Sequence, residues 1–157
     1  MSIGTFPVHV PPTGGTPVFL VGDTYTTLLD AAQTSGELSL VEAIVPVNAG
    51  PPPHTHLRES ETFVLLEGNL VVTAGEEKYE VEPGGVVYVP KGTTHSFTNL
   101  SSTKPARMYF LYTPGGMDGM FAEIGTPGER GVVGPPLNDA DVRAMGALAS
   151  KYHYTFD

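Results

Sequence analysis

Four side chains in two separate blocks of this 157-residue sequence have the types and spacing of metal ligands. His54 and His56 are followed by Glu61, and His95 lies in a later block that begins with Pro-Lys-Gly. Neutral imidazole and carboxylate together suit Fe, Mn, Ni, Cu or Zn. Cysteine is absent, so nitrogen and oxygen atoms must supply any metal site. The sequence therefore predicts one divalent transition metal as cofactor, without fixing which metal.

The spacing of these residues agrees with a site built on strands. His54 and His56 are two residues apart, and side chains two apart on a strand project from the same face. An isolated His-x-His is weak evidence, but Glu61 and His95 each stand at the start of a short apolar run that is typical of a strand. Glu59 is the competing carboxylate, and we expect it to be exposed or to lie behind the ligands.

The elements that must position these residues are short strands. The 19 glycines and 15 prolines are spread between short apolar runs, which indicates strands joined by turns. The expected strands are Val18–Val21, Tyr25–Leu29, Glu37–Pro46, Glu61–Leu66, Leu70–Thr73, Lys78–Val81, Val86–Val89, His95–Thr98 and Ala106–Thr113. This pattern predicts an all-β sandwich or barrel.

Two turns suggest how neighbouring strands pair. Gly68-Asn69 and Gly75-Glu76 can both supply the positive φ that a two-residue hairpin loop needs. The strands on either side of each turn are therefore expected to be antiparallel neighbours, as in a meander.

The chain changes character after Thr113. Apolar residues at spacings of three and four predict a short helix over Met117–Ile124, and Asn138 is expected to cap a second helix. The apolar face of the second helix would consist of Val142, Met145, Leu148, Ala149 and Tyr152. Residues 125–136 are expected to form a loop. The first helix would either close the mouth of a barrel as a lid or cover a sheet edge.

The two blocks resemble the two sequence motifs of the cupin family. The first motif is matched by His54, His56, Glu61 and Gly68, and the second by Gly84, Pro90, Gly92, His95 and Asn99. One departure is visible, because the glycine that usually precedes the first histidine by six residues would fall at Asn48, whereas here it is Gly50. The resemblance covers Gly50 to Asn99, about a third of the chain.

This resemblance implies a cupin jelly-roll β-barrel with one or two short C-terminal helices. Residues 1–157 would form a single cupin domain, with a barrel core over about 18–113 and a helical extension over about 114–157. The metal would be bound inside the barrel by His54, His56, Glu61 and His95. A homodimer is expected by analogy with the family.

Within the family, the chain is similar to small cupins of the quercetin 2,3-dioxygenase type. The resemblance implies a dioxygenase that uses O2 to cleave or oxidise a flavonol-like or other enolisable small-molecule substrate. Glu61 would be the catalytic residue, taking the proton of the substrate hydroxyl. Phe63, Phe97 and Tyr112 are expected to line the substrate pocket, although plain core packing would also explain them. Along 106–113 the inward set is either Met108, Phe110 and Tyr112 or the alternate Arg107, Tyr109 and Leu111.

Two other kinds of function remain open at this point. A non-redox metal-dependent cupin would be a cyclase, isomerase, lyase or decarboxylase, which zinc would support without oxygen. A non-catalytic cupin would only bind a small molecule, and its metal would contribute stability.

Charge and composition disfavour several other classes. The formal charge is −9, from 17 acidic and 8 basic residues, so nucleic acid and anionic membrane surfaces are unsuitable partners. We find no run of 18 apolar residues and no basic, apolar leader at the start of the sequence, which favours a cytoplasmic location. His9 and His153 lie outside the ligand pattern and are expected at the surface.

Overall fold

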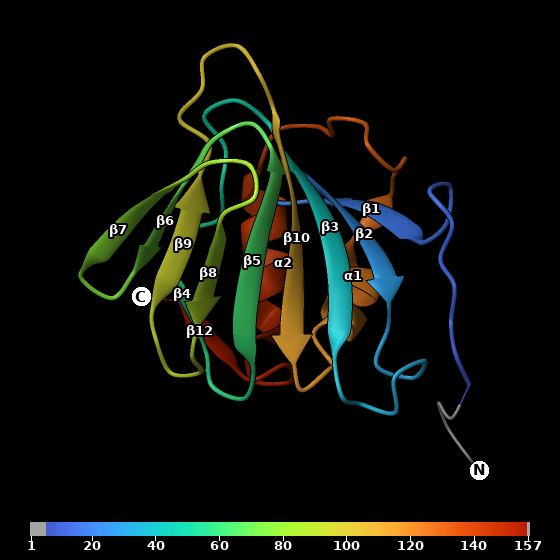
Figure 1. Cartoon of the computed structure of the whole chain (residues 1–157). Helices are drawn as coiled ribbons and strands as arrows, with labels where there is room; N and C mark the ends of the chain where they lie inside the picture. Colours follow the sequence, from blue (N-terminus) through green and yellow to red (C-terminus); the bar gives the residue numbers. More distant parts are fainter. Residues whose placement is uncertain (1–5, 157) are drawn as a thin grey trace.

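Two antiparallel β-sheets face each other in the computed structural model, which describes residues 6–156 (Figure 1). The seven-stranded sheet has the order β11 (Thr126–Pro127), β1 (Thr16–Leu20), β2 (Asp23–Leu29), β3 (Ser39–Val45), β10 (Ala106–Thr113), β5 (Ser60–Glu67) and β8 (Val86–Val89). The five-stranded sheet has the order β12 (Tyr154–Phe156), β4 (His54–His56), β9 (His95–Thr98), β6 (Leu70–Ala74) and β7 (Glu77–Val81). The expected all-β jelly roll is confirmed, in the form of two sheets that do not join into one continuous ring.

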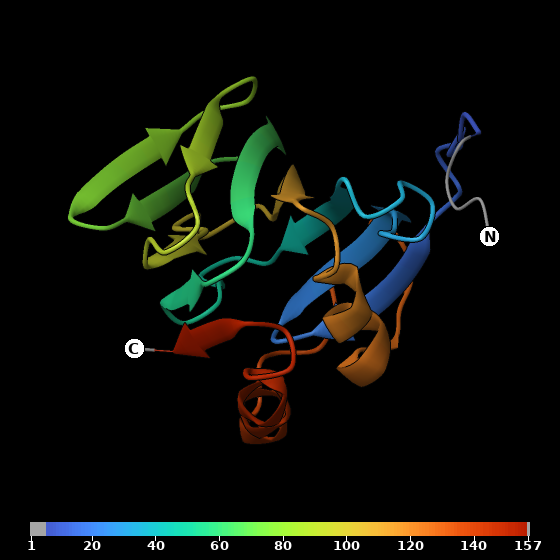
Figure 2. The same cartoon turned by 90° about the horizontal axis from the view of Figure 1, so that it is seen from below.

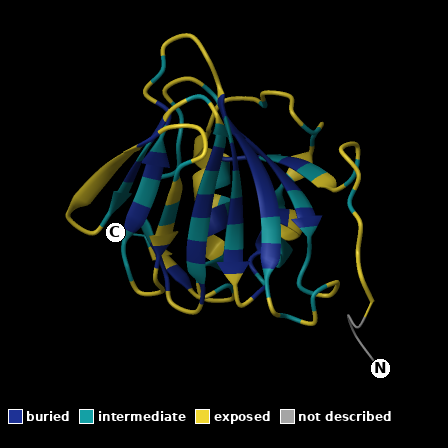
Figure 3. Cartoon of the chain, in the orientation of Figure 1, coloured by how far each residue is buried: buried dark blue, intermediate teal, exposed yellow. Residues whose placement is uncertain are grey.

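Alternation of side chains along the strands builds the interior. In β10, Met108, Phe110 and Tyr112 are buried, while the residues between them are only partly buried. This result selects the first of the two sets that the sequence left open. Strand β5 alternates in the same way and turns Glu61 and Phe63 inward. Figure 3 shows the buried positions alternating along these central strands, whereas β7 is largely exposed.

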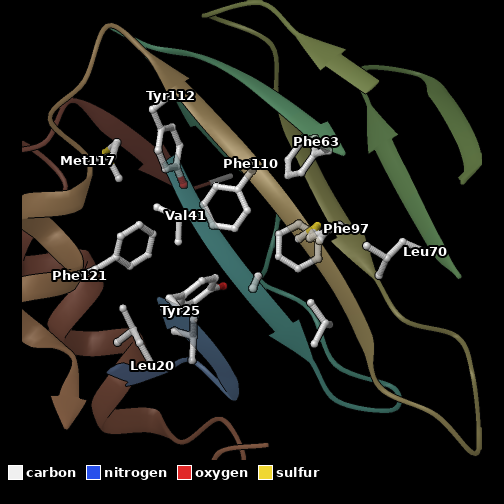
Figure 4. Close-up of a cluster of buried hydrophobic side chains, with 14 of the residues drawn as sticks. Leu20, Tyr25, Val41, Phe63, Leu70, Phe97, Phe110, Tyr112, Met117 and Phe121 are labelled. Atoms are coloured by element: carbon white, nitrogen blue, oxygen red, sulfur yellow. The ribbon is translucent and has the colours of Figure 1, made fainter. Parts of the chain in front are cut away.

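Aromatic rings fill one part of the space between the sheets. Tyr25 contacts Phe121 and Phe110, with ring centroids 4.8 and 5.8 Å apart, and Phe110 also contacts Tyr112 at 5.4 Å. Figure 4 shows these rings converging from β2, β10 and the first helix. Such edge-on and tilted contacts stabilise a core beyond the burial of area alone.

The prediction of a hairpin at Gly68-Asn69 is wrong. Strand β5 pairs with β10 and β8, whereas β6 pairs with β7 and β9, so this turn carries the chain from one sheet to the other. Gly68 does adopt a positive φ of 83°, but a tight turn does not decide which strands become neighbours. The second predicted hairpin, through Gly75, is confirmed by the β6–β7 pairing, so the meander is only local.

Three short strands were absent from the expected set of strand segments. Strand β4 contains only His54-Thr55-His56, and β12 pairs with it, placing Tyr154 opposite His56 and Phe156 opposite His54. Strand β11 lies within the stretch 125–136 that was expected to be a loop, and it pairs with β1. Strands of two or three residues are too short to show the alternation on which sequence reasoning depends.

Both predicted helices are present, as α1 (Asp118–Ile124) and α2 (Asp139–Leu148). The side chain of Asn138 accepts a hydrogen bond from the backbone of Asp141, whose own side chain accepts one in return, which confirms the predicted cap of α2. Met145 is buried, whereas Val142 is exposed, so the predicted apolar face begins one turn late. Figure 2 shows both helices on the side of the molecule that carries β1, β2 and β12. Within residues 6–156, neither helix has the length and apolar character that a membrane crossing requires.

Candidate metal centre

The four predicted ligands converge in the space between the sheets. His54 and His56 come from β4, His95 lies opposite His54 in the β4–β9 pairing, and Glu61 projects from β5 in the facing sheet. One ligand atom of each residue lies within 4.8 Å of all the others. Ligands held at about 2.0–2.2 Å from one ion are separated from each other by roughly 3–4 Å, so this group has the spacing of a single metal site.

Glu61 is the anionic group of the cluster. Its Oε2 atom lies 2.8 Å from Nε2 of His95 and 3.3 Å from Nε2 of His56. Burial alone would raise the pKa of the Glu61 carboxyl, but the two histidines outweigh burial and lower it far below its usual value. Glu61 is therefore ionised at neutral pH and can act as a metal ligand or as a proton acceptor.

The histidines are held so that their Nε2 atoms face the cluster. Nδ1 of His54 lies 3.0 Å from the carbonyl oxygen of Pro52, and Nδ1 of His95 lies 2.9 Å from that of Thr93. Because a carbonyl oxygen only accepts hydrogen bonds, each Nδ1 carries a proton. In a neutral ring this leaves the Nε2 lone pair free for a metal, the arrangement that fixes metal-binding histidines in general.

Two observations test whether the cluster fits a cation. The lone pair of a neutral His95 would face the Glu61 carboxylate at 2.8 Å, so a proton or a metal ion must lie between these atoms. His56 is buried, and within the described residues neither of its ring nitrogens has a hydrogen-bond partner. Buried polar atoms are nearly always satisfied, and a metal at the centre of the cluster would satisfy Nε2 of His56, the nitrogen that faces Glu61. The residues therefore fit a divalent metal.

The charge states of His54 and His95 differ because of their surroundings. Burial, reinforced by the two neighbouring histidines, lowers the pKa of His54 to about 4 against the opposing effect of Glu61. Burial also opposes the charged form of His95, but contact with Glu61 raises its pKa above the usual value. His54 is thus neutral at physiological pH, whereas the contact with Glu61 favours the charged form of His95.

Glu59 does not belong to the ligand cluster. Its carboxylate is buried, with a relative exposure of 2%, so the expectation of an exposed residue is wrong. Oε1 lies 3.6 Å from Nε of Arg58, and Oε2 has no hydrogen-bond partner among the described residues. Burial raises the pKa of Glu59, and His56 and Arg58 oppose that shift. Glu59 is therefore a buried carboxylate outside the cluster that His56 influences electrostatically, in agreement with the alternative that the sequence left open.

A small cavity with a volume of about 30 Å³ adjoins the cluster. Phe97 and Tyr112 line it as predicted, whereas Phe63 packs behind, with its ring 6.0 Å from that of His95. The complete lining consists of Leu20, Val21, Tyr25, Pro51, His54, His56, Glu61, Phe97, Phe110, Tyr112, Met117, Met120, Phe121, Met145 and Tyr154. Sequence reasoning missed Tyr25, Met145 and Tyr154 as lining residues, because they come from elements far from the motifs.

Helix α1 covers this cavity. Met117, Met120 and Phe121 line it from one side, and Met145 of α2 contributes beside them. The spacing of three and four along 117–121 was the signal in the sequence, although it did not reveal what the helix covers. Of the two possibilities considered for this helix, the cover over the barrel interior is the one that the lining residues support.

Tyr112 places a hydroxyl-bearing ring beside the ligands. Its ring centroid lies 5.3 Å from that of His56. Burial, and then the negative charge of Glu61, raise the pKa of Tyr112 well above its usual value. The hydroxyl of Tyr112 is therefore neutral and can donate a hydrogen bond toward the site.

Comparison with known proteins supports the motif assignment. Residues 41–112 match the family model described as a cupin domain. An uncharacterized protein of Methanocaldococcus jannaschii is 36% identical over 76 residues, covering 48% of this chain and 61% of that protein. Quercetin 2,3-dioxygenase of Bacillus subtilis is 29% identical over 111 residues, covering 70% of this chain and 32% of the enzyme. The chain thus spans less than two thirds of the length of either relative.

Solved structures show the same fold. The structure of an RmlC-like cupin from Shewanella frigidimarina superposes with a TM-score of 0.60 at 17% identity, covering 71% of this chain and 96% of that one. At this identity the likeness concerns the fold alone. The family model and the two motifs that hold the cluster therefore identify residues 41–112 of the chain as a cupin domain.

Proposed function

We propose that the protein is a metal-dependent dioxygenase that oxidises or cleaves a flavonol-like or other enolisable small molecule with O2. The observation that carries this proposal is the position of the ligand cluster, because three of its four members, His54, His56 and Glu61, line an otherwise apolar, aromatic cavity. The similarity to quercetin 2,3-dioxygenase of Bacillus subtilis supports the same class of reaction.

The lining of the cavity favours an aromatic substrate over a small dicarboxylic acid. None of the lining residues is Lys or Arg, so a dianion would find no positive side chain beyond the histidines. Phe110, Tyr112 and Phe121 instead offer ring faces and edges against which a flat aromatic molecule packs well. Ligand sites are mostly apolar with a few placed polar groups, and this cavity has that composition.

The bound metal, Glu61 and Tyr112 would each have a separate role in this reaction. A bound divalent metal would lower the pKa of a substrate hydroxyl and supply the redox chemistry with O2. Glu61, ionised and buried, accepts the hydroxyl proton and so serves as the general base. Tyr112 and the surrounding rings exclude water, which strengthens the interactions of the charged substrate with the site.

The size of the cavity requires motion during substrate entry. About 30 Å³ accommodates one or two water molecules, far less than a flavonol. Helices α1 and α2 contribute Met120, Phe121 and Met145 to the wall and are not held in a sheet. Opening of these helices is therefore part of the proposed function.

A second candidate is a non-redox metal-dependent cupin acting on a much smaller substrate. The small volume of the cavity favours it, because such a substrate would require less opening. This candidate differs from the first in a measurable way, since zinc would support turnover and oxygen would be unnecessary.

Oxygen consumption with quercetin tests the proposal. Protein stripped with a chelator is reloaded with Fe, Mn, Ni, Cu or Zn, and metal content is measured alongside oxygen uptake. We expect uptake with at least one redox-active metal and none with zinc. Glu61→Gln should lower the rate by about 100-fold or more, whereas Glu67→Gln, at an exposed position on the same strand, should retain it. Turnover with zinc under anaerobic conditions would favour the second candidate, and metal binding without any turnover would favour a binding protein.

A further inference from the structure

A second polar pair lies inside the barrel, away from the metal ligands. Asp23 and Tyr25 are two residues apart on β2 and are both buried, with relative exposures of 0% and 4%. The hydroxyl of Tyr25 donates a hydrogen bond to Oδ2 of Asp23 at 2.8 Å. Tyr25 lines the same cavity as three of the metal ligands, and Figure 4 shows its ring beside those of Phe110 and Phe121.

The position of Tyr25 follows from a row of ring contacts. Tyr112 contacts His56, Phe110 and Phe121 contact Tyr112, and both of these phenylalanines contact Tyr25. Tyr25 therefore lies one layer of rings beyond Tyr112, as seen from the ligand cluster. A flat molecule bound to the metal at one end would extend along these rings toward Tyr25.

The three tyrosines of the cavity differ in what their hydroxyls can offer. Tyr154 donates its proton to the carbonyl oxygen of Met145 and so holds α2 in place. Tyr112 lies beside the metal ligands. While Asp23 is ionised, the proton of Tyr25 is committed to it, so the Tyr25 oxygen presents lone pairs and can only accept a further hydrogen bond.

The buried pair is unfavourable for folding. Oδ1 of Asp23 has no hydrogen-bond partner among the described residues, although the residue is completely buried. A buried carboxyl group with an unsatisfied oxygen destabilises a protein, and an apolar pair at these positions would pack without that penalty. Buried titratable groups that line a cavity are typical of binding and catalytic sites.

We propose that the Tyr25 oxygen accepts a hydrogen bond from a hydroxyl group at the end of the substrate remote from the metal, with Asp23 as the positioning residue that holds the Tyr25 proton. This inference rests on the proposed function and narrows its substrate class. The substrate would be an enolisable aromatic compound that carries a second hydroxyl on the ring opposite its metal-binding group. Discrimination of this kind is effective, because a buried acceptor left without its donor lowers affinity.

Binding of two flavonols in the absence of oxygen tests this inference. Quercetin carries hydroxyl groups on its remote rings, and the unsubstituted parent flavonol shares only the metal-binding group. Dissociation constants for both are measured by fluorescence titration with the zinc-loaded protein, so that no turnover is required. The wild-type protein should prefer quercetin, and Tyr25→Phe should weaken quercetin about three- to tenfold while changing the affinity for the parent flavonol less than twofold.

Two further variants separate a specific role from a structural one. Asp23→Asn retains the shape of the side chain but can donate its own proton to Tyr25, so the preference for quercetin should decrease without being abolished. If Tyr25→Phe alone does not fold, the same dissociation constants are measured with the double variant Asp23→Asn/Tyr25→Phe, which removes the buried charge. Metal content and melting temperature are recorded for every variant.

The outcomes distinguish the two levels of the proposal. Equal affinities of the wild-type protein for both flavonols, or equal weakening of both by Tyr25→Phe, would overturn the role of Tyr25 while leaving flavonol binding intact. If neither flavonol bound to the zinc-loaded wild-type protein, both the flavonol assignment and this inference would be overturned.

Discussion

Glu61 and His95 determine the chemistry of the centre at the scale of single residues. Their 2.8 Å contact places an anion and an imidazole nitrogen at a distance that only a shared cation explains. A proton and a divalent metal compete for this position, so metal binding should release a proton. The contacts of Glu61 with His56 and His95 explain why burial fails to neutralise it and why its pKa stays low.

Asp23 gives a prediction about stability and pH. Burial, only partly offset by the hydrogen bond from Tyr25, raises the pKa of Asp23 to about 7 from 3.8. The folded state therefore binds the proton more tightly than the unfolded state between these values, and stability falls as pH rises from about 4 to 7. Asp23→Asn should lack this loss, so its advantage in unfolding free energy over the wild type should grow across that window, toward an upper value on the order of 4 kcal/mol.

Urea unfolding of chelator-treated protein at several pH values measures this difference. Titration of Glu61 and the histidines contributes equally to both proteins, so the comparison isolates Asp23. A difference in unfolding free energy that stays constant from pH 4 to pH 8 would contradict the prediction.

The sequence was informative about the ligands themselves and less so about the residues behind them. Spacing from His56 distinguished Glu61 from Glu59, and the structure brings Glu61 alone into the cluster. Glu59 shares the parity of Glu61 and is buried like it, but it stands one residue before β5, so the sequence did not show that the alternation extends to it. The Asp23–Tyr25 pair carried no motif, and only the fold brings Tyr25 to the cavity.

Gly50 gives a prediction at the scale of elements. It precedes strand β4, and a Cβ atom at this position would lie 1.9 Å from the carbonyl oxygen of Phe97 in β9. Gly50→Ala should therefore destabilise the protein by at least about 2 kcal/mol and weaken metal binding by shifting His54. Gly146 in α2 is the matched control, because an added Cβ there has no atom within 4 Å.

Thermal and urea unfolding compare the two glycine variants. Gly146→Ala should stabilise the protein by about 0.5–1 kcal/mol, since alanine is the better helix former. Equal effects of the two substitutions would show that the approach of β9 to Gly50 is not tight. Gly50 stands two residues after the usual glycine position of the motif, and this close approach explains why glycine is required here.

Glu123 of α1 is bound to Lys151 and Tyr152 in the segment after α2, and this tether gives a second prediction at the scale of elements. Oε2 of Glu123 accepts hydrogen bonds from Nζ of Lys151 at 2.7 Å and from the hydroxyl of Tyr152 at 2.6 Å. Exposed ion pairs of this kind contribute little to stability, so the tether can break while the sheets stay intact. Glu123→Ala should accelerate amide exchange in α1 severalfold and leave the melting temperature nearly unchanged.

Hydrogen exchange detected by mass spectrometry measures this effect, with Glu129→Ala as a control at a carboxylate outside the tether. Unchanged exchange in α1 of the Glu123 variant would mean that the helix is held by Met120 and Phe121 alone.

Element types were predictable from alternation and turn residues, whereas their partners were not. Strands β5 and β6 were found from their apolar runs, yet Gly68 joins two sheets instead of forming a hairpin. Turn residues fix local backbone angles, and the choice of partner depends on which faces must be buried together. Strand β12 gave no signal because its three residues are too few to show alternation.

The whole molecule combines an acidic surface with an apolar, closed interior. A formal charge of −9 opposes binding of polyanions, and the cavity beside the ligands has no Lys or Arg. The walls of that cavity come from both sheets and both helices, so no single stretch of sequence could have revealed its shape or the substrate. The metal site was readable because its ligands lie in two compact motifs.

The proposed chemistry depends most directly on a single metal ion held by residues from both sheets. Elemental analysis after reloading with excess Mn, Ni or Zn and exhaustive dialysis tests this claim. We expect one ion per chain in the wild type and in His153→Ala, which changes an exposed histidine. His54→Ala and His95→Ala should bind the metal more than tenfold more weakly. Metal content that is unchanged in His54→Ala, or absent from the wild type in excess cation, would contradict this claim.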